Sequence, residues 1–438
     1  MWRGIPRASY IAAWHEHAPC VRTLVPTPTM TITDILSLAI AVLTLLGVAA
    51  GRFPVLRMNR ATIALVGAVA VVLVGGLSFD EAIQAVDAHT IVLLFAMMVV
   101  NVNLRLAGFF QLLSTHILSV ARTSRQLLLL VIFAAGVLSS LFLNDTIVLM
   151  FTPLLLDVVL ALRRNPLPYM LGLMMAANIG SAATVVGNPQ NMIIGVASGI
   201  GFIDFTIALL VPSLLGLVLL QGVLVLGFRD EFRGGRLTAP ALPRPRVHVP
   251  LLRKGLAALC IMLVALIVGV PVSLAALGAA SLLLLTRRLK PERVFRELDW
   301  SLLVFFVGLF IITAAVHKGV VGEALLRFAT TFGVDRIPGL AMVSLLASNL
   351  ISNVPAVMLL APMVRALPDP TLLWLTLAMA TTFAGNLTIL GSVANMIVVE
   401  AARGRGVHVG FLSYLRLGVP VTVVTLLLGT LWMLWLAG

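Results

Sequence analysis

Long apolar segments follow one another along almost the whole chain, separated by short polar stretches. Most are near the roughly 20 residues that a membrane-spanning helix needs. They cover residues 32–50, 61–77, 89–104, 126–162, 168–198, 205–228, 255–270, 272–286, 300–316, 338–367, 371–400 and 412–436. Polar residues interrupt 126–162 and 338–367 near the middle, so we predict that these two segments are re-entrant hairpins. The pattern therefore predicts an all-α polytopic membrane protein.

Composition narrows this picture by excluding other classes of protein. Of the 438 residues, 60% are hydrophobic and 11% are charged, whereas a soluble domain carries about 25% charged residues. A water-soluble sphere of this size cannot bury so many apolar side chains. Soluble globular, disordered and disulfide-rich classes are excluded, and the two cysteines, Cys20 and Cys260, form neither a disulfide framework nor a zinc set.

The basic residues predict the orientation in the membrane. The formal net charge is +13, and most of the 30 Lys and Arg residues lie in clusters at 51–60, 105–125, 163–164, 229–254, 287–296 and 403–416. The positive-inside rule brings all these clusters to the cytoplasm only if each hairpin enters and leaves by the same face. We therefore predict ten crossings plus two hairpins in a bacterial inner membrane, with both termini outside. Residues 1–29 have no apolar run, so we expect a disordered leader and a translation start at Met30.

The second half of the chain repeats patterns of the first half. Asp87 with HTIVLLFAMM matches Asp299 with WSLLVFFVGL, NDTIVLMFTP from Asn144 matches NVPAVMLLAP from Asn353, and TVVGNPQNMI (184–193) matches TILGSVANMI (388–397). Each half has an odd number of predicted crossings, so the second lies inverted relative to the first. We predict repeats at 30–228 and 255–438, joined by a basic cytoplasmic linker at 229–254. This architecture is typical of secondary transporters with a midplane site.

Polar motifs interrupt helices at matching places in the two halves. Gly187 with Pro189 and, in the second half, Gly391 break apolar segments, which membrane interiors tolerate only inside protein or beside water. Broken ends and hairpin tips leave backbone groups and amides that bind ions. Capping of helix ends or contacts between helices is the structural alternative. The candidate substrate- and ion-binding residues are Asn144, Asp145, Thr146, Thr184, Gly187, Asn188, Gln190, Asn191, Ser352, Asn353, Thr388, Gly391, Ser392 and Asn395.

Asp145 stands apart from the other candidates as the only acid that the pattern puts near mid-membrane. Such a carboxylate is typical of proton or sodium coupling, although it also fits a helix cap. Asp87 and Asp299 are expected to cap the helices that follow them. The predicted transport core contains no basic residue, so helix ends and amides would have to hold an anion. The chain has no Walker, HExxH or GxSxG motif, so we expect neither an enzyme nor a metal or cofactor site, only a coupling H⁺ or Na⁺.

The motifs NDTIVLMFTP, ANIGSAATVVGNPQNMI, SNVPAVMLLAP and FAGNLTILGSVANMIVVE resemble the citrate-transporter-like domain of the ion transporter superfamily. This group includes arsenite efflux permeases, divalent-anion/sodium symporters, sodium/proton antiporters and melanosomal P-protein-like permeases. The resemblance covers 32–436. It implies that Asn144, Thr146, Ser352 and Asn353 lie on hairpin tips, facing breaks at 187–191 and 391–395. Leu143-Asn144-Asp145 departs from the Ser-Asn-Thr tip of the dicarboxylate branch and is more similar to arsenite permeases, which implies proton-coupled export.

The expected function is secondary transport of a small anion or an oxyanion such as arsenite. Asp145 would couple H⁺ or Na⁺ movement to alternating access of a unit that contains the hairpins. The alternatives are a sodium/proton antiporter, a sodium-coupled dicarboxylate symporter or an anion channel. The expected partners are the lipid bilayer and the anion, with no nucleic acid. The resemblance also leaves a homodimer open.

Overall fold

Helices make up nearly all of the structure, a computed structural model that describes residues 30–53, 58–233, 237, 245–285, 289–318, 321–324, 327 and 331–438. The predicted leader at 1–29 and much of the linker lie outside these ranges. The first half contains α1 (Ile32–Ala50), α2 (Arg60–Leu73), α3 (Phe79–Gln84), α4 (Ala88–Leu106), α5 (Phe109–Val120), α6 (Ser124–Leu141), α7 (Asn144–Ala161), α8 (Pro166–Ser181), α9 (Pro189–Ser198), α10 (Phe202–Gly227) and α11 (Arg229–Phe232). The second half contains α12 (Val249–Ile267), α13 (Val272–Leu284), α14 (Pro291–Arg296), α15 (Trp300–His317), α17 (Ile337–Ile351), α18 (Asn353–Arg365), α19 (Thr371–Ala384), the 3₁₀ turn η1 (Ile389–Gly391), α20 (Val393–Arg403) and α21 (Phe411–Ala437).

A small ribbon corrects the all-α expectation. β1 (Arg52–Phe53) pairs antiparallel with β2 (Met58–Asn59) between α1 and α2. The chain reverses here within a few residues, and its backbone N–H and C=O groups pair across the reversal instead of remaining unsatisfied. The fold is therefore nearly all-helical, and the ribbon keeps the end of α1 close to the start of α2.

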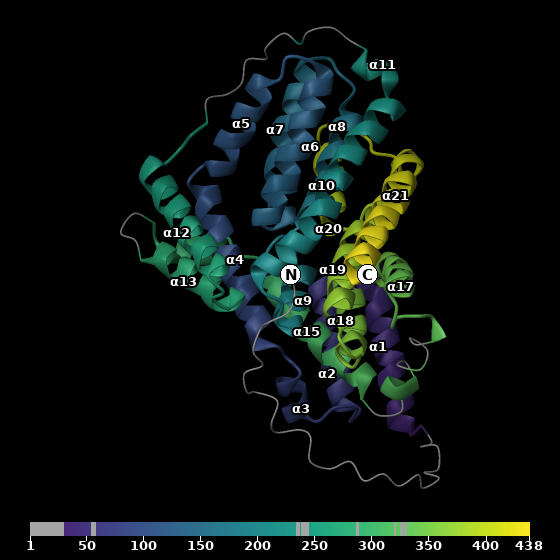
Figure 1. The fold of residues 1–438 in the computed structure, drawn as a ribbon. Coiled ribbons are helices and arrows are strands. Elements are labelled where there is room, and N and C mark those ends of the chain that lie inside the picture. The colour runs from purple at the N-terminus through teal and green to yellow at the C-terminus, as the bar shows by residue number, and fades with distance from the viewer. Residues whose placement is uncertain are drawn as a thin grey trace.

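Among the described residues, eight helices are long and apolar enough to cross a membrane, by length and composition: α1, α4, α6, α7, α10, α12, α15 and α21. Five shorter apolar helices accompany them: α2, α13, α17, α18 and α19. The chain is a multi-pass membrane protein, while the ten crossings and two hairpins stay predictions. The interrupted segment 126–162 divides at residues 142–143 into α6 and α7, and 338–367 divides at Ser352 into α17 and α18. In Figure 1 the first pair lies in the upper part of the molecule and the second pair in the lower part, with α19 and α20 between them.

Local sequence signals explain where several helices begin. Asp87 caps α4 by accepting hydrogen bonds from the N–H of His89 (2.9 Å) and from the hydroxyl of Thr90 (2.8 Å). Asp299 caps α15 by accepting from the N–H of Leu302 (3.1 Å). The prediction that these two aspartates cap their helices is confirmed.

Both predicted helix breaks are present. The chain leaves helical geometry between α8 and α9 and again between α19 and α20. At Gly187 a Cβ atom would lie 2.7 Å from the carbonyl oxygen of Ser139, so only Gly lets the first break approach the end of α6 this closely. The Gly187 carbonyl accepts from the N–H of Asn144 (3.1 Å). This bond fastens the first break to the start of α7.

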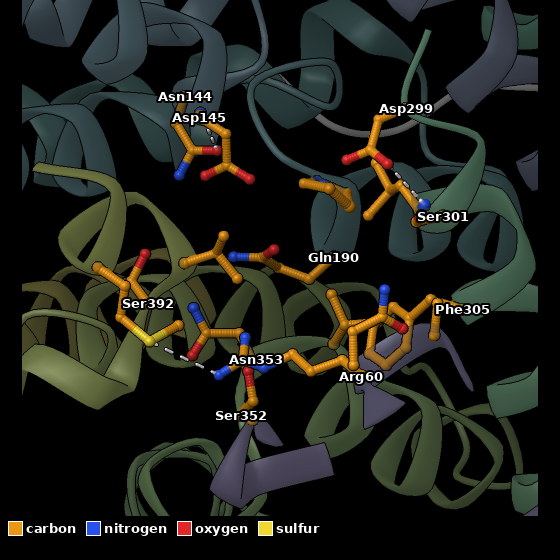
Figure 2. Close-up of a pocket in the computed structure, with 18 residues that line it drawn as sticks. Arg60, Asn144, Asp145, Gln190, Asp299, Ser301, Phe305, Ser352, Asn353 and Ser392 are labelled. Carbon is orange, nitrogen blue, oxygen red and sulfur yellow. Dashed lines mark hydrogen bonds between the residues drawn. The ribbon is translucent and has the colours of Figure 1, made fainter. Parts of the chain in front are cut away.

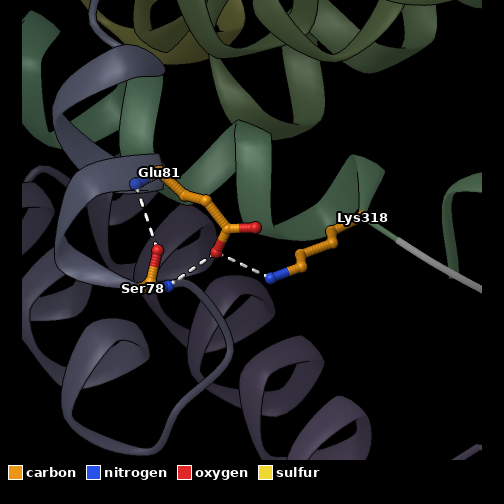
Figure 3. A network of polar contacts seen from close by, with 3 residues as sticks. All are labelled: Ser78, Glu81 and Lys318. Carbon is orange, nitrogen blue, oxygen red and sulfur yellow. Dashed lines mark hydrogen bonds and ion pairs between the residues drawn. The ribbon is translucent and has the colours of Figure 1, made fainter.

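Outside the spans, an ion pair joins α3 to the residue that follows α15. Figure 3 shows the carboxylate of Glu81 between Lys318 and Ser78. Lys318 Nζ lies 2.8 Å from Glu81 Oε2, and the N–H of Ser78 donates to the same oxygen at 2.7 Å. These contacts, the lysine first, lower the pKa of Glu81 from 4.5 to about 2. The carboxylate is exposed, so it contributes modestly to stability.

Candidate functional site

A cavity of about 320 Å³ lies where the interrupted segments and the helix breaks meet (Figure 2). Six of the sequence-predicted site residues line it: Asn144, Asp145, Gln190, Ser352, Asn353 and Ser392. The wall also contains residues from the ends of α1, α2 and α15. Segments that are far apart in the sequence therefore share one site.

Six helices, α2, α7, α9, α15, α18 and α20, begin at this cavity. The start of α9 is capped by Asn188, whose side chain accepts from the N–H of Asn191 (2.8 Å). α18 and α20 have no side-chain cap, and within the described residues the N–H groups of Val354 and Val393 have no hydrogen-bond acceptor. Free N–H groups give a helix N-terminus partial positive charge. Two helices therefore direct unused donors at the cavity, where water or an anion can accept from them.

The tip between α17 and α18 has a strained backbone. Ser352 has φ 78° and ψ 159°, a region almost exclusive to Gly, where another residue costs on the order of 1–3 kcal/mol. The adjacent Asn353 holds the tip, because its amide lies 3.1 Å from the carbonyl oxygens of Thr381 and Gly391, to which its nitrogen donates. Strain held in this way concentrates at ligand sites.

Sequence reasoning missed a buried amide that connects the two halves of the site. Asn178 of α8 donates through Nδ2 to the side-chain oxygens of Asn386 (2.9 Å) and Asn395 (3.1 Å). Its Oδ1 accepts from Ser392 Oγ (3.0 Å) and Asn144 Nδ2 (3.3 Å). All four hydrogen-bonding positions of the amide are used. The sequence did contain a signal for Asn178, because an amide inside a strongly apolar helix needs hydrogen-bond partners.

Two matching asparagines hold the helix breaks. Asn191 Nδ2 donates to the carbonyl oxygen of Thr184 (2.9 Å). Asn395 Nδ2 donates to the carbonyl oxygens of Gly385 (2.7 Å) and Thr388 (3.2 Å). Each side chain binds carbonyls that lose their helical partners at a break. Asn191 and Asn395 therefore support the helix breaks, the structural role that was the alternative to ion binding, and they do not line the cavity.

The other predicted site residues also lie behind the wall of the cavity. Thr382 of α19, which sequence reasoning missed, accepts at Oγ1 from the side chains of Asn188 and Gln190, each at 3.3 Å. This contact ties the first break to a helix of the second half. The eight predicted residues that do not line the cavity are Thr146, Thr184, Gly187, Asn188, Asn191, Thr388, Gly391 and Asn395.

The charges of the cavity correct two expectations. Arg60 and Asp299 line it together with Asp145, so the core does contain a basic residue and Asp145 is not its only acid. Arg60 reaches the site because the β1–β2 ribbon lets α2 begin beside the cavity, and Asp299 does so as the cap of α15. Within the described residues the Asp145 carboxylate accepts no hydrogen bond, and it interacts electrostatically with both Arg60 and Asp299.

Comparison with known protein families shows which family this chain belongs to. The family model CitMHS, described as "Citrate transporter", matches residues 41–384. The chain belongs to the citrate transporter family. The resemblance identified from the paired motifs is thereby confirmed, and membership in this family indicates a transport role and not catalysis.

Relatives along most of the chain agree with this membership of the citrate transporter family. The 46 kDa membrane protein of Mycobacterium leprae is 30% identical, over 87% of this chain and 94% of its own length. The silicon efflux transporter LSI3 of Oryza sativa is 30% identical, over 86% and 92%. The putative transporter arsB of Dictyostelium discoideum is 24% identical, over 85% and 87%. The crystal structure of the Alcanivorax borkumensis YdaH transporter, at 16% identity and TM-score 0.57 over 92% of this chain and 98% of that one, shares the fold.

Proposed function

We propose that this member of the citrate transporter family is a secondary active transporter of a small anion or oxyanion in the plasma membrane. The cavity described above is its substrate site, and Asp145 couples transport to H⁺ or another cation. Relatives whose names include silicon efflux and arsB support an oxyanion or oxyacid as the substrate.

The observation that carries the proposal is the convergence of helix N-termini on one cavity. Each N-terminus is equivalent to roughly half a positive charge, and inside a membrane this charge is weakly screened. The unbonded N–H groups of Val354 and Val393 supply donors, and the amides of Asn144, Gln190 and Asn353 supply further polar contacts on the wall. Such a site suits a small anion better than a cation or an apolar molecule.

Asp145 is the group we assign to coupling. Its carboxylate lines the cavity and accepts no hydrogen bond from the described residues, so it is available to a proton or a sodium ion. Intramembrane carboxylates with this exposure to a cavity are typical of ion coupling. Asp157, further along the same helix, is different because it pairs with Arg405 at 2.8 Å.

Two cavities at opposite ends of the same helices support alternating access. A second cavity, of about 570 Å³, is lined by later residues of α9, α15 and α18, among them Ile193, His317 and Arg365. On α15 the first cavity ends at Phe305 and the second begins at Phe310, a separation of about 7.5 Å along the helix. A small displacement would suffice to transfer a bound anion. The charge pattern assigns the first cavity to the cytoplasmic side and the second to the outside.

The same arrangement supports the inverted repeat. α7 and α18 both begin at the cavity, and Asn191 and Asn395 bind break carbonyls in the same way. We propose that α6–α9 and α17–α20 are the paired elements, and that they move together against the remaining helices. Ten crossings with two hairpins remain part of this proposal.

Transport by the reconstituted full chain tests the function. Proteoliposomes are offered sulfate, citrate, arsenite and silicic acid under imposed pH or sodium gradients. We expect gradient-driven accumulation of at least one of them. Cation exchange without any anion would favour a sodium/proton antiporter, and flux that only dissipates the anion gradient would favour a channel. Either result contradicts the proposal.

Single cysteines test the site itself. In a Cys20→Ser, Cys260→Ser background, we expect Ser301→Cys to be labelled by an impermeant thiol reagent from the cytoplasmic side and to be protected by the transported anion. Thr313→Cys, in the second cavity, should be labelled from the outside. Asp230→Cys, whose side chain is fully exposed on α11 outside the candidate spans, serves as the control that no anion protects. Equal labelling of Ser301→Cys with and without the anion would contradict the substrate site.

A further inference from the structure

Arg60 is the cavity residue that neither capping nor the amide network explains. It is the first residue of α2, and its side chain extends across the cavity toward Asn353 (Figure 2). Its guanidinium lies over Gly51, where a Cβ atom would come within 3.5 Å of Nε. Gly51 has φ 80°, a conformation that favours Gly. The guanidinium therefore packs against the backbone at the end of α1, and it is the backbone conformation of Gly51, not the space beside it, that requires Gly.

The guanidinium has no ion-pair partner in the described residues. The ion pairs found within 4.0 Å there do not include Arg60. Among the residues that the structure describes, its one hydrogen-bond contact is with the weak acceptor Met396 Sδ, at 3.9 Å. Arg105, a basic residue at the end of α4, pairs with Glu297 at 2.5 Å. Without a carboxylate partner, this half-buried guanidinium keeps most of its N–H donors unused. Burial makes each unused donor costly, so a ligand that accepts from them is favoured.

The two carboxylates of the cavity, Asp145 and Asp299, do not occupy the unused donors of the Arg60 guanidinium. Asp299 uses Oδ1 to cap α15 through the N–H of Leu302 (3.1 Å). Asp145 interacts with Arg60 through space and not through a hydrogen bond. A ligand oxygen between Arg60 and the N–H groups of Val354 and Val393 would therefore meet donors on two sides. The planar fork of a guanidinium matches two oxygens of a carboxylate or oxyanion.

We propose that Arg60 is the specificity-determining residue of the substrate site, and that it binds two oxygens of a small ionised oxyanion or carboxylate. The inference rests on the proposed function and narrows it, because it selects an ionised ligand over an undissociated oxyacid. Arsenous and silicic acids are uncharged at neutral pH and gain little from a guanidinium. Sulfate and carboxylates gain a charge-assisted, two-point contact.

Kinetics of three variants in proteoliposomes test this assignment, with sulfate, acetate and citrate as charged probes and arsenous and silicic acids as uncharged ones. For the transported anion, Arg60→Gln should raise KM about tenfold or more, the loss typical of a hydrogen-bonded charge. Arg60→Lys keeps the charge but loses the fork, so its KM should rise less. Arg105→Gln is the matched control and should leave KM unchanged. Unchanged KM in Arg60→Gln would overturn the assignment, as would wild-type transport restricted to the uncharged acids.

Arginine labelling of the wild-type protein gives a second readout that needs no variant. Phenylglyoxal modifies accessible guanidinium groups, and peptide mapping locates the product. The transported anion should slow modification of Arg60 several-fold and leave Arg105 unaffected. Equal modification of Arg60 with and without the anion would overturn the inference while leaving transport itself intact. If the wild-type protein transports none of the probes, the proposed function fails, and the role of Arg60 fails with it.

Discussion

Replacing Asn178 with Ala removes the four hydrogen bonds that join the first tip to the second break. The Asn178 partners lie at 2.9, 3.0, 3.1 and 3.3 Å. Side-chain hydrogen bonds between membrane helices average about 0.6 kcal/mol each. We therefore expect Asn178→Ala to lose about 2 to 3 kcal/mol of unfolding free energy through these bonds, in addition to the loss of buried volume.

Asn101→Ala is the matched control for this experiment. Asn101 lies in α4 and is 3% exposed, compared with 1% for Asn178, but its amide nitrogen and oxygen have no partner within the described residues. Both variants lose the same atoms, so the difference between them isolates the network. Unfolding by sodium dodecyl sulfate in mixed micelles measures both free energies. A difference below about 0.5 kcal/mol, less than one average bond of this kind, would refute the role assigned to Asn178.

Three further substitutions test other parts of the structure. Glu81→Gln removes the ion pair with Lys318. Because the pKa of Glu81 is lowered from 4.5 to about 2, wild type should melt at a higher temperature than the variant above pH 4.5, and this difference should vanish as the pH falls toward 2. Equal melting temperatures of the two proteins at pH 7 would contradict a stabilising ion pair. Ser352→Gly relieves the strained tip and should raise the unfolding free energy by about 1 kcal/mol, whereas Ser344→Gly, inside α17, should lower it. Gly187→Ala brings a Cβ within 2.7 Å of the Ser139 carbonyl oxygen, so it should destabilise the protein by about 1 kcal/mol or more, and unchanged micelle unfolding would contradict the close approach.

Local patterns were sufficient to predict much of the fold and part of the site. Gly187, Pro189 and Gly391 interrupt apolar segments that otherwise read as continuous, so the breaks were predictable from sequence. The tip residues Asn144 and Asn353 were predictable because they occupy matching places in the sequence patterns of the two halves. Their placement on one cavity wall agrees with the geometry expected of such pairs.

Long-range placement could not be predicted in the same way. Arg60 belongs to a cluster of arginines that reads as a determinant of topology, and nothing near it indicates that α2 begins beside the cavity. Asn178 is satisfied by partners 34 to 217 residues away, and no local signal specifies them. Neighbouring polar residues of one motif also differ in role, since Gln190 lines the cavity and the adjacent Asn191 supports the break.

The proposed function requires that the cavity bind an anion whose transport is coupled through Asp145. This coupling is tested by measuring flux in proteoliposomes under an imposed pH or sodium gradient, in wild type and in Asp145→Asn. We predict that wild type accumulates its anion against a concentration gradient. Asp145→Asn should still bind the anion and equilibrate it across the membrane, but should no longer respond to the imposed gradient. Unchanged gradient-driven accumulation by Asp145→Asn would show that Asp145 does not couple transport to the ion gradient.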